Sequence, residues 1–385
     1  MLLEGGMFYF NPKHLFFVPG SCVAYLNEFA CELQYEIFED QGEHWISRND
    51  WTRMLSHVEK MRSEGNACFT LLRDGILYGP LEKLAGFLPG ASFARQGDLL
   101  WISLEGAGQG KEWERTAKVT PEAEWERLLA RIRLQRKGKE FGDFYFTYWL
   151  EGLKKWFPYR FYIPTAAEEG GALPLVICLH GGRGGANSMS DLAKGRLQEM
   201  AERHGMYLLC PDGVTFDSTY GCLAPPSCLA EEQIDGTCPE NPLHFTEEEQ
   251  ERKAWGEKGL LFLLELLKQR YPIHPEQIFL MGNSMGGMGT FYLGTKYPEL
   301  FHALAPSGTM PDLRFFPWEK LKETPVLFLA GTEDGCGFSG MRRLCRKMKE
   351  AGIPIAFQTI GGGAHSDAWV SGLSDIFAFF ERSQK

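Results

Sequence analysis

The stretch Ile278-Phe-Leu-Met-Gly-Asn-Ser-Met-Gly-Gly287 decides the fold of the second half of the chain. Its first four residues form a short apolar run, which is typical of a strand buried on both faces. A helical pattern over residues 287–296 follows. Between them lies G-x-S-x-G, in which a strained turn exposes Ser284 and a Cβ at either glycine is expected to clash. The alternative interpretation is a Gly-rich turn with an ordinary helix-capping serine.

The alternation of strand-like and helical patterns continues from about residue 157 to the C-terminal part of the chain. Strands that are apolar throughout need helices over both faces of their sheet. The alternation therefore predicts an α/β fold with a doubly wound, mostly parallel sheet, whose ligand site lies at the carboxyl ends of the strands. The strand-like runs are residues 175–179, 207–210, 278–281, 301–305, 326–330 and 355–360. The helical patterns cover residues 192–201, 251–270 and 339–352, and Gly205 is the expected stop of the first.

Two polar residues follow the last two predicted strands. Asp334 lies in Gly-Thr-Glu-Asp-Gly after residues 326–330, and His365 lies in a glycine-rich loop after residues 355–360. A serine hydroxyl needs a base to become a good nucleophile, and the base needs a carboxylate to hold its tautomer. The chain order Ser284, Asp334, His365 matches the order in which such a fold supplies nucleophile, acid and base. We expect these three to form a triad, with Glu333 as the reserve for the acid.

A glycine-rich loop, His180-Gly-Gly-Arg-Gly-Gly185, directly follows the strand-like run at residues 175–179. Loops of this type supply a backbone N–H to an oxyanion hole, together with the residue after the nucleophile. We therefore expect the N–H groups of Gly182 and Met285 to be the oxyanion donors. A phosphate-binding loop is the competing interpretation, but neither G-x-G-x-x-G nor a Walker lysine pattern is present.

The composition limits the classes of partner. The net charge is -10 and no strong basic cluster is present, so we expect no nucleic-acid partner. The apolar runs fall far short of the roughly 20 residues that a membrane-spanning helix needs. The N-terminus does not read as a signal peptide, so we expect a cytoplasmic protein with free thiols. Cys178 and Cys210 lie in apolar strand patterns and are expected to be buried.

The first 140 residues have a different character. They contain an aromatic-rich, strand-like piece at residues 99–104 and a helical pattern from Pro121 to about Lys137, with Thr120 as its cap. We expect residues 1–140 to form a smaller α+β domain that caps the active site or supports oligomerisation. Residues 141–385 are expected to form the α/β domain.

A polar insert at about residues 213–250 interrupts the α/β pattern. Cys222, Cys228, Cys238 and His244 lie within it, at spacings wider than the C-x2–4-C pairs of common zinc sites, so we expect free cysteines and no metal. Three aromatic residues near the expected site either line a pocket for an aromatic acyl group or pack in the core or a lid. They are Trp369, Tyr220 and Trp255.

With these residues in place, residues 140–385 resemble the esterase and polyhydroxybutyrate-depolymerase branch of the α/β-hydrolases. That branch includes feruloyl and acetyl-xylan esterases and borders the catalytic domain of prolyl oligopeptidases. The similar segments include Phe157-Pro-Tyr-Arg-Phe-Tyr-Ile-Pro164, Leu175-Val-Ile-Cys-Leu-His-Gly-Gly182 and Ala305-Pro-Ser-Gly308. The resemblance implies that Ser284 is the nucleophile, His365 the base and Asp334 the orienting acid. It also implies a small-molecule ester substrate and no cofactor or metal.

Two rival functions stay open. One is a serine peptidase or acyl-peptide hydrolase of the prolyl oligopeptidase type, although about 140 residues cannot supply a propeller of several four-stranded blades. The other is a catalytically silent hydrolase fold that acts as a binding module. A homo-oligomer is a further expectation.

Overall fold

The computed structural model describes residues 12–56, 71–88, 91–96, 99–104, 121–136, 140–223, 245–311, 317–335 and 337–384. The chain divides into two compact units. The C-terminal unit comprises Met1–Tyr9, Glu140–Phe144 and Tyr159–Lys385, and the N-terminal unit comprises Phe10–Lys139 and Tyr145–Pro158. Strands β9 (Gly142–Leu150) and β10 (Lys155–Ile163) contribute residues to both units.

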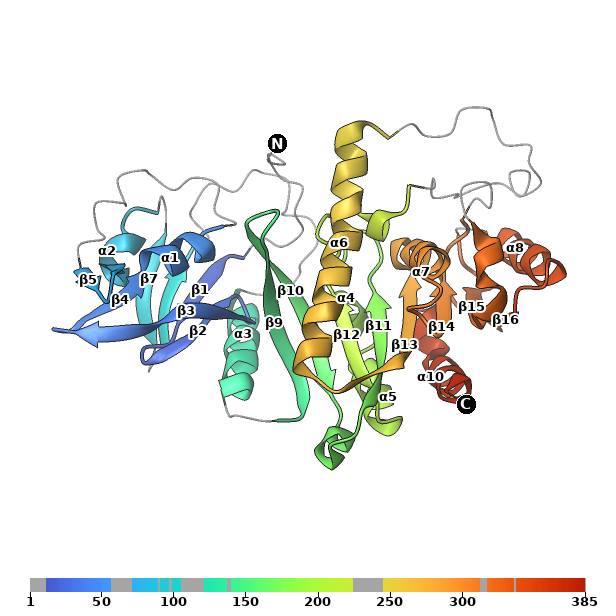
Figure 1. Ribbon diagram of the computed structural model, residues 1–385, viewed down its shortest axis with the longest axis horizontal. Helices are drawn as coiled ribbons and strands as arrows, with labels where there is room; N and C mark the ends of the chain where they lie inside the picture. Colours follow the sequence, from blue (N-terminus) through green and yellow to red (C-terminus); the bar gives the residue numbers. More distant parts are fainter. Residues whose placement is uncertain are drawn as a thin grey trace. The chain divides into compact units, whose positions relative to one another are not determined.

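The C-terminal unit alternates strands and helices along the chain (Figure 1). Its further strands are β11 (Leu173–Leu179), β12 (Tyr207–Pro211), β13 (Ile273–Asn283), β14 (Ala303–Ser307), β15 (Val326–Gly331) and β16 (Ile355–Ile360). Its helices are α4 (Ser188–Leu192), α5 (Arg196–Arg203), α6 (Glu247–Arg270), α7 (Met285–Lys296), α8 (Phe338–Glu350), α9 (Ala368–Ser371) and α10 (Leu373–Ser383), with 3-10 turns η2 (Thr165–Glu169), η3 (Thr219–Gly221) and η6 (Trp318–Glu323).

The strands of this unit follow the order β16-β15-β14-β13-β11-β12-β10. Neighbours from β16 to β12 pair in parallel, and β10 pairs antiparallel with β12. Strand β12 is added to the sheet on one side of β11, and β13 is added on the other side. The direction in which strands are added therefore reverses between β11 and β13. Ligands bind at such a reversal, outside the carboxyl ends of the strands. The predicted doubly wound, mostly parallel sheet is confirmed.

Both faces of the sheet are buried along β11, β12, β14 and β15, whereas the edge strand β16 is only partly buried. On one face, alternate strand residues such as Cys178, Met281 and Leu329 pack with α5, α9 and α10 in a single apolar cluster. On the other face, Phe328 meets Phe291 of α7 edge to face, with ring centroids 5.5 Å apart. Burial on both faces explains why these strands are apolar throughout.

The helical pattern predicted around residues 192–201 forms two helices instead of one. Lys194 and Gly195 adopt positive φ angles between α4 and α5, and this breaks the helix. Leu192 consequently points to solvent and is half exposed, whereas Leu197 is buried as expected. Gly205 ends α5 with φ 60°, as predicted.

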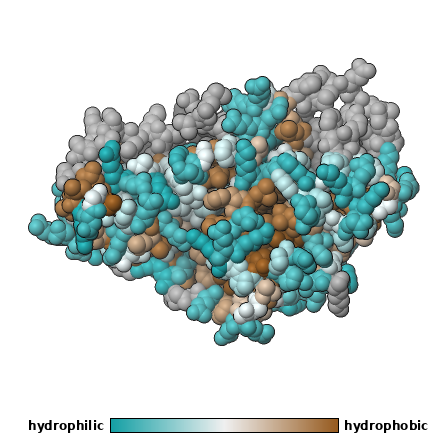
Figure 2. All heavy atoms as spheres, viewed as in Figure 1, coloured by the Kyte–Doolittle hydropathy of each residue, from teal (hydrophilic) through white to brown (hydrophobic). Residues whose placement is uncertain are grey.

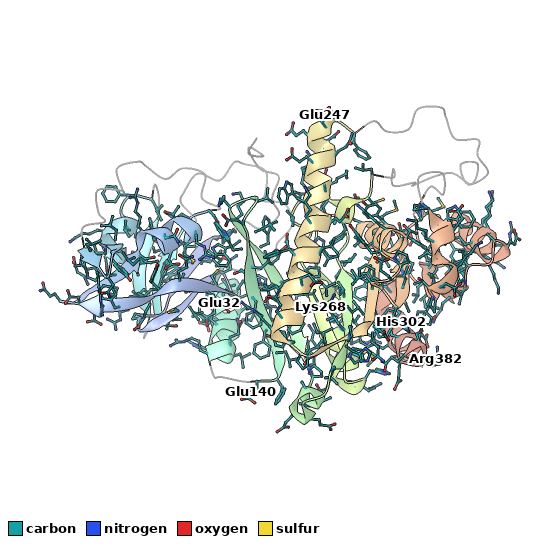
Figure 3. The ribbon with its side chains drawn as sticks, in the orientation of Figure 1. Glu32, Glu140, Glu247, Lys268, His302 and Arg382 are labelled. Carbon is teal, nitrogen blue, oxygen red and sulfur yellow. The ribbon has the colours of Figure 1, made fainter. Side chains whose placement is uncertain are left out.

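Helix α6 begins at a capping box. The Thr246 side chain accepts from the Glu249 N–H, and the Glu249 side chain accepts from the Thr246 N–H, so two exposed backbone donors are satisfied. Figure 3 labels Glu247 at the beginning of this helix and Lys268 near its end.

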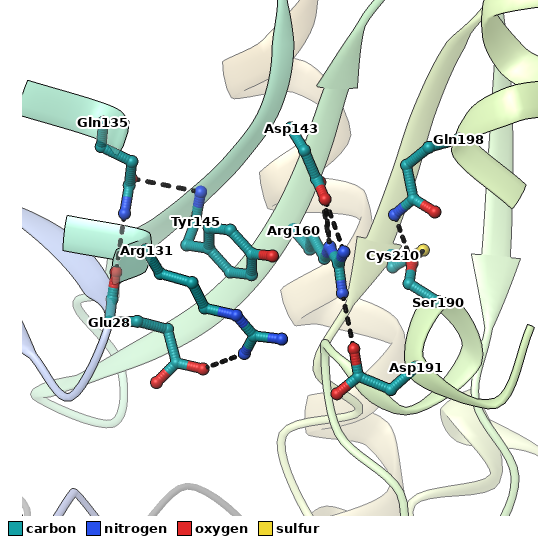
Figure 4. Close-up of polar contacts among 10 residues, drawn as sticks. All are labelled: Glu28, Arg131, Gln135, Asp143, Tyr145, Arg160, Ser190, Asp191, Gln198 and Cys210. Atoms are coloured by element: carbon teal, nitrogen blue, oxygen red, sulfur yellow. Dashed lines mark hydrogen bonds and ion pairs between the residues drawn. The ribbon is translucent and has the colours of Figure 1, made fainter. Parts of the chain in front are cut away.

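A buried arginine links three elements of the C-terminal unit (Figure 4). The Arg160 Nε donates to Asp143 Oδ1 at 2.9 Å, and its Nη1 donates to Asp191 Oδ1 at 3.0 Å. Two carboxylates therefore compensate the desolvated guanidinium, and the geometry ties β10 to α4.

In its described residues, the N-terminal unit combines mostly antiparallel strands with helices α1, α2 and α3. Its strands follow the order β9-β3-β2-β1-β8-β7, in which β3 and β9 pair in parallel, and β4 and β6 extend from β3 with β5 beyond them. The bounds are β1 (His14–Phe17), β2 (Ser21–Leu26), β3 (Phe29–Asp40), β4 (Glu43–Ser47), β5 (Leu71–Arg73), β6 (Ile76–Pro80), β7 (Ser92–Gln96), β8 (Leu99–Ser103), α1 (Arg48–Met54), α2 (Leu81–Ala85) and α3 (Pro121–Arg136).

Helix α3 closes the core of this unit. Its Leu129 and Ile132 pack with Phe16 and Tyr25 of the sheet. The Arg131 Nη1 donates to Glu28 Oε1 at 2.6 Å, as Figure 4 shows. In the face of the molecule drawn in Figure 2, hydrophilic residues cover most of the surface and hydrophobic residues gather in patches between them.

Within the described ranges, no helix is both long and apolar enough to cross a membrane. The same residues contain no group of three or more His, Cys, Asp or Glu placed to hold a metal ion. Cys178 and Cys210 are free and buried, as predicted.

Candidate active site

Ser284 lies in a strained turn between β13 and α7. Its φ of 58° and ψ of -118° are unfavourable for a residue with a side chain. A Cβ on Gly282 would come within 2.5 Å of the Gly286 carbonyl oxygen, and a Cβ on Gly286 within 2.2 Å of the Leu179 carbonyl oxygen. The expected clash at both glycines is confirmed, and the turn holds the serine at the carboxyl end of β13.

His365 and Asp334 form an ion pair at the ends of two neighbouring strands. The His365 Nδ1 lies 3.0 Å from Asp334 Oδ1, with the Asp334 side chain fully buried and one third of the His365 side chain exposed. Glu333, the reserve for the acid, is exposed. The acid of this pair is therefore Asp334.

Backbone contacts hold the two loops that carry this pair. The Glu333 N–H donates to the Gly363 carbonyl at 3.0 Å, and the Gly362 N–H donates to Thr332 Oγ1 at 2.8 Å. A Cβ on Gly331 would lie 2.0 Å from the Gly363 carbonyl oxygen. Because the loops meet this closely, the imidazole and the carboxylate have little freedom to separate.

The carboxylate of Asp334 sets the protonation of His365. Its hydrogen bond and charge raise the pKa of the imidazole above the ordinary histidine value, against the lowering effect of burial. A carboxylate accepts, so Nδ1 carries the proton in this pair and the Nε2 lone pair is left to act as a base.

Asn283 joins the nucleophile turn to the histidine loop. Its Nδ2 donates to the His365 carbonyl at 3.0 Å, and its Oδ1 accepts from Ser307 Oγ at 2.8 Å. Gly308 adopts φ 55°, and a Cβ there would lie 2.5 Å from Asn283 Oδ1 and 3.2 Å from the His365 ring. The sequence analysis did not predict that Asn283 connects the two loops. A polar amide at the end of an apolar strand could have indicated such a contact.

The loop after β11 lies beside the nucleophile. A Cβ on Gly181 would lie 3.5 Å from the Ser284 Cβ, whereas a Cβ on Gly182 would have open space around it. Met285 is the first residue of α7, so its N–H is at the positive end of the helix. The assignment of Gly182 and Met285 as oxyanion donors stays a prediction that this proximity favours.

His180 anchors this loop from a fully buried position. Burial lowers the pKa of its imidazole to about 4, so the ring is neutral. The Gly213 N–H donates to Nε2 at 2.9 Å, and Nδ1 therefore donates to the Gly181 carbonyl at 2.8 Å. The ring thus ties the glycine loop to the residues that follow β12.

Tyr220 completes this anchor. Its hydroxyl accepts from the His180 N–H at 3.1 Å, and the side chain is completely buried. The sequence left two roles open for Tyr220, a substrate contact or packing in the core or a lid. The buried side chain contacts the glycine loop at His180, and a role in substrate binding stays a prediction.

The backbone around Tyr220 is strained and tightly enclosed. Val214, Thr219 and Tyr220 all adopt positive φ angles, and Cβ atoms on Gly256 or Gly289 would clash with this segment. Residues 213–223 are the described beginning of the predicted insert. Cys222 is buried, whereas Cys228, Cys238 and His244 lie outside the described residues.

The other two aromatic candidates occupy different environments. Trp369 is buried in the apolar cluster, and its Nε1 donates to the Ser366 carbonyl at 2.9 Å, so it offers no surface to a substrate. Trp255 is partly exposed, with the Lys258 ammonium 4.7 Å from its ring centroid. Of the three aromatic candidates, Trp255 is therefore the one with surface to contact a ligand, and that role stays a prediction.

Comparison with known protein families gives a match, which covers the middle of the chain. Residues 151–334 match the family model described as "Esterase: Putative esterase". Ser284 and Asp334 lie inside the matched range, and His365 lies beyond it. No curated protein matches the chain. The match confirms the resemblance to the esterase branch of the α/β-hydrolases and supports ester hydrolysis.

Solved structures of several hydrolases resemble the chain. A thermostable esterase shares 20% identity, with 62% of each chain covered and a TM-score of 0.45. An S-formylglutathione hydrolase from Agrobacterium tumefaciens shares 18% identity over 64% of this chain and 97% of its own, with a TM-score of 0.49. A ferulic acid esterase from Anaeromyces mucronatus, solved with ferulic acid, shares 17% identity over 65% and 94%, with a TM-score of 0.47.

Proposed function

We propose that this α/β-hydrolase of the esterase branch is a serine carboxylesterase that forms an acyl-enzyme on Ser284. One observation carries the proposal: a serine in a strained turn lies at the same sheet edge as a 3.0 Å His365–Asp334 pair. The serine turn, the His365–Asp334 pair and the glycine loop follow different strands. A G-x-S-x-G match that arose by chance would not be expected to have these groups beside it.

The first half of the proposed reaction makes the acyl-enzyme. The Ser284 Oγ attacks the ester carbonyl carbon while His365 Nε2 accepts the hydroxyl proton. Asp334 stabilises the resulting imidazolium through Nδ1. The carbonyl oxygen becomes an oxyanion facing the N–H groups of Gly182 and Met285. The intermediate collapses, the bond to the alcohol oxygen breaks, and His365 returns the proton to the leaving alcohol.

The second half releases the acid. Water attacks the acyl carbon and passes a proton to His365 Nε2. A second tetrahedral intermediate breaks the bond to Ser284 Oγ, and that oxygen recovers the proton from His365. Because Asp334 raises the pKa of His365, the imidazole is a stronger base for both proton transfers than an unpaired histidine.

For the substrate we propose a small carboxylic ester with an acetyl or an aromatic, feruloyl-type acyl group. The esterase family match supports the ester class. A panel of acetyl, feruloyl and longer-chain esters, compared by kcat/KM, separates these acyl groups. An aminoacyl amide in the same panel tests the peptidase alternative, which predicts amide turnover comparable with the best ester.

Ser284→Ala tests the proposed nucleophile with p-nitrophenyl acetate as substrate. The matched control is Ser339→Ala, which removes an exposed serine on α8. We expect kcat to fall by about 10⁴-fold or more in Ser284→Ala and to stay at the wild-type value in the control. Wild-type turnover by Ser284→Ala would exclude the proposal, and absence of activity in the wild type would favour the silent binding module.

For the N-terminal unit we propose the roles expected from the sequence, capping or oligomerisation. The mass of the full chain in solution, measured by sedimentation, tests the second role. A monomer at all concentrations would exclude it.

A further inference from the structure

The N-terminal unit contains a pocket of its own. Its volume is about 620 Å³, which is within the range of small-molecule sites. Arg53, Leu55, Ser56 and Trp149 form the less exposed part of the lining. The exposed part of the lining is formed by Gln34, Asn49, Thr52, Glu151 and Lys154.

Arg53 presents its guanidinium to this pocket with its donors unused. The group lies 4.9 Å from the Trp149 ring centroid and 4.4 Å from that of Trp156, and the side chain is only 16% exposed. The Arg53 Nη1 forms an ion pair with Asp50 Oδ1 at 3.8 Å, a distance too long for a hydrogen bond. Among the described residues, the guanidinium forms no hydrogen bond. A buried guanidinium with five unused N–H donors can form paired hydrogen bonds to a planar anion such as a carboxylate.

The neighbouring charged groups already have hydrogen-bond partners of their own. The Asp50 oxygens accept from the Gln34 N–H at 2.8 Å, the Tyr35 N–H at 3.1 Å and Ser47 Oγ at 2.7 Å. Lys154 pairs with Glu151 at the rim. Within the described lining, Arg53 is therefore the pocket cation whose hydrogen-bond donors are left for a ligand, because its ion pair with Asp50 at 3.8 Å uses none of them. A single positive charge suits a monoanionic carboxylate better than a doubly charged phosphate.

Neutral polar groups surround this cation. Asn49 Nδ2 donates to Gln34 Oε1, which leaves Asn49 Oδ1 and the Gln34 amide hydrogens without a partner in the described part of the chain. Ser56 Oγ is buried and likewise has no partner among the described residues. Leu55 and Trp149 supply apolar surface beside them. Hydroxyl groups of a ligand match these donors and acceptors.

We propose that this pocket binds a small hydroxylated carboxylate of the sugar-acid class. The carboxylate pairs with the Arg53 fork, and the ring hydroxyls bond to Gln34, Asn49 and Ser56. All the described lining residues belong to the N-terminal unit, so the inference is independent of the proposed esterase reaction.

The first test is calorimetric titration of the full chain with sodium D-glucuronate. D-Glucose, which lacks the carboxylate, and inorganic phosphate are the comparison ligands. We expect glucuronate to bind at least about 10-fold more tightly than either, because the charged hydrogen bonds to Arg53 are made by the carboxylate alone. No binding of glucuronate, or equal binding of glucose or phosphate, would overturn the proposal.

The second test is Arg53→Gln against Arg73→Gln. Arg73 also lies over an aromatic ring, Phe38 at 4.8 Å, but it is exposed and outside the pocket, so the pair is matched in charge and unit. We expect Arg53→Gln to weaken glucuronate binding by about 10-fold or more, and Arg73→Gln to leave it unchanged. Turnover of p-nitrophenyl acetate should be the same in both.

Arg53→Lys covers the case in which Arg53→Gln fails to fold. Lysine retains the charge and the apolar stem but lacks the planar fork, so binding should weaken while the fold is kept. Wild-type affinity in Arg53→Lys together with equal affinity for phosphate would contradict the carboxylate assignment. Equal loss in Arg53→Gln and Arg73→Gln would show a general charge effect and would also overturn it.

Discussion

Strand β11 of the C-terminal unit and strand β3 of the N-terminal unit bury their side chains in different ways. From Pro174 to Leu179, every residue of β11 is buried. In β3, the exposed Glu32, Gln34 and Glu36 alternate with more buried neighbours. A parallel sheet with helices on both faces needs the first pattern, and an antiparallel sheet with one solvated face needs the second.

This difference has a consequence for the polar groups of each unit. In the C-terminal unit, polar side chains gather at the strand ends, where backbone contacts and buried partners hold them. In the N-terminal unit, the polar face of β3 contributes Gln34 to a pocket whose cation keeps free donors. One arrangement favours a pre-organised catalytic site, and the other favours a binding site that its ligand completes.

The largest expected effect comes from Asp334→Asn, because it removes the charge that orients His365. We expect kcat for p-nitrophenyl acetate to fall by about 10⁴-fold with both units still folded. Glu333→Gln, at the exposed neighbouring position, is the matched control and should retain activity. Equal effects of the two substitutions would remove Asp334 from the triad.

The pH profile of the same variant gives a second readout. The reaction needs neutral His365, so the wild-type rate should rise with pH through a midpoint above the ordinary histidine pKa. Without the carboxylate that raises this pKa, the residual rate of Asp334→Asn should have its midpoint at lower pH. An unmoved midpoint would mean that another group controls the profile.

Alanine substitution of one apolar residue in each unit compares how much buried and exposed strand residues stabilise the fold. Phe279 of β13 is fully buried and stacks on Phe380 at 4.8 Å, whereas Leu72 of β5 is 66% exposed. We expect Phe279→Ala to lower the free energy of unfolding by about 3–5 kcal/mol. For Leu72→Ala we expect a change within about 0.5 kcal/mol. Urea denaturation checks both, and similar losses would contradict the contrast in burial.

Asn283→Ala should produce a smaller catalytic effect than Asp334→Asn. The variant frees the His365 carbonyl from its 3.0 Å anchor, so the imidazole shifts from its productive position. We expect kcat to fall by about 10- to 100-fold with KM nearly unchanged. Asn49→Ala, an exposed asparagine of the N-terminal unit, is the control, and unchanged kcat in Asn283→Ala would show that the anchor is dispensable.

Tyr220→Phe should have the smallest effect of this series on kcat. The variant leaves the buried His180 N–H without its acceptor at 3.1 Å, which should cost about 1–3 kcal/mol of stability and loosen the oxyanion loop. Tyr162→Phe, which removes a hydroxyl that donates to Glu202 at 3.0 Å, is the control in the same unit and should not change kcat. A larger fall in the control would contradict the positioning role.

Local patterns predicted the elements that are buried along their whole length. The strands expected at residues 175–179 and 326–330 lie within β11 and β15, which are buried over these residues. Strand β13 begins at Ile273, five residues before the predicted run, because its first half is partly exposed and breaks the apolar pattern. Helix α10 was not predicted, although Leu373, Ile376, Phe377 and Phe380 have the spacing of one buried helical face.

The residues of the candidate triad could be predicted from their order along the chain. The residues that pack around the triad and its loops could not. Ser284, Asp334 and His365 each follow a strand of the pattern. Tyr220 depends on non-local space, because a Cβ on Gly256 would clash with Ser218 beside it and one on Gly289 with its own ring. No local pattern shows such space, so the sequence could not decide between packing and substrate contact for this aromatic residue.

The most direct test of the central claim is the covalent modification of Ser284. The full chain is treated with a fluorophosphonate probe, and the mass of the protein and of its peptides is measured. The account predicts one adduct per chain, on the peptide that contains Ser284, and no adduct in Ser284→Ala. A stable adduct on another serine, or none on an active enzyme, would contradict it.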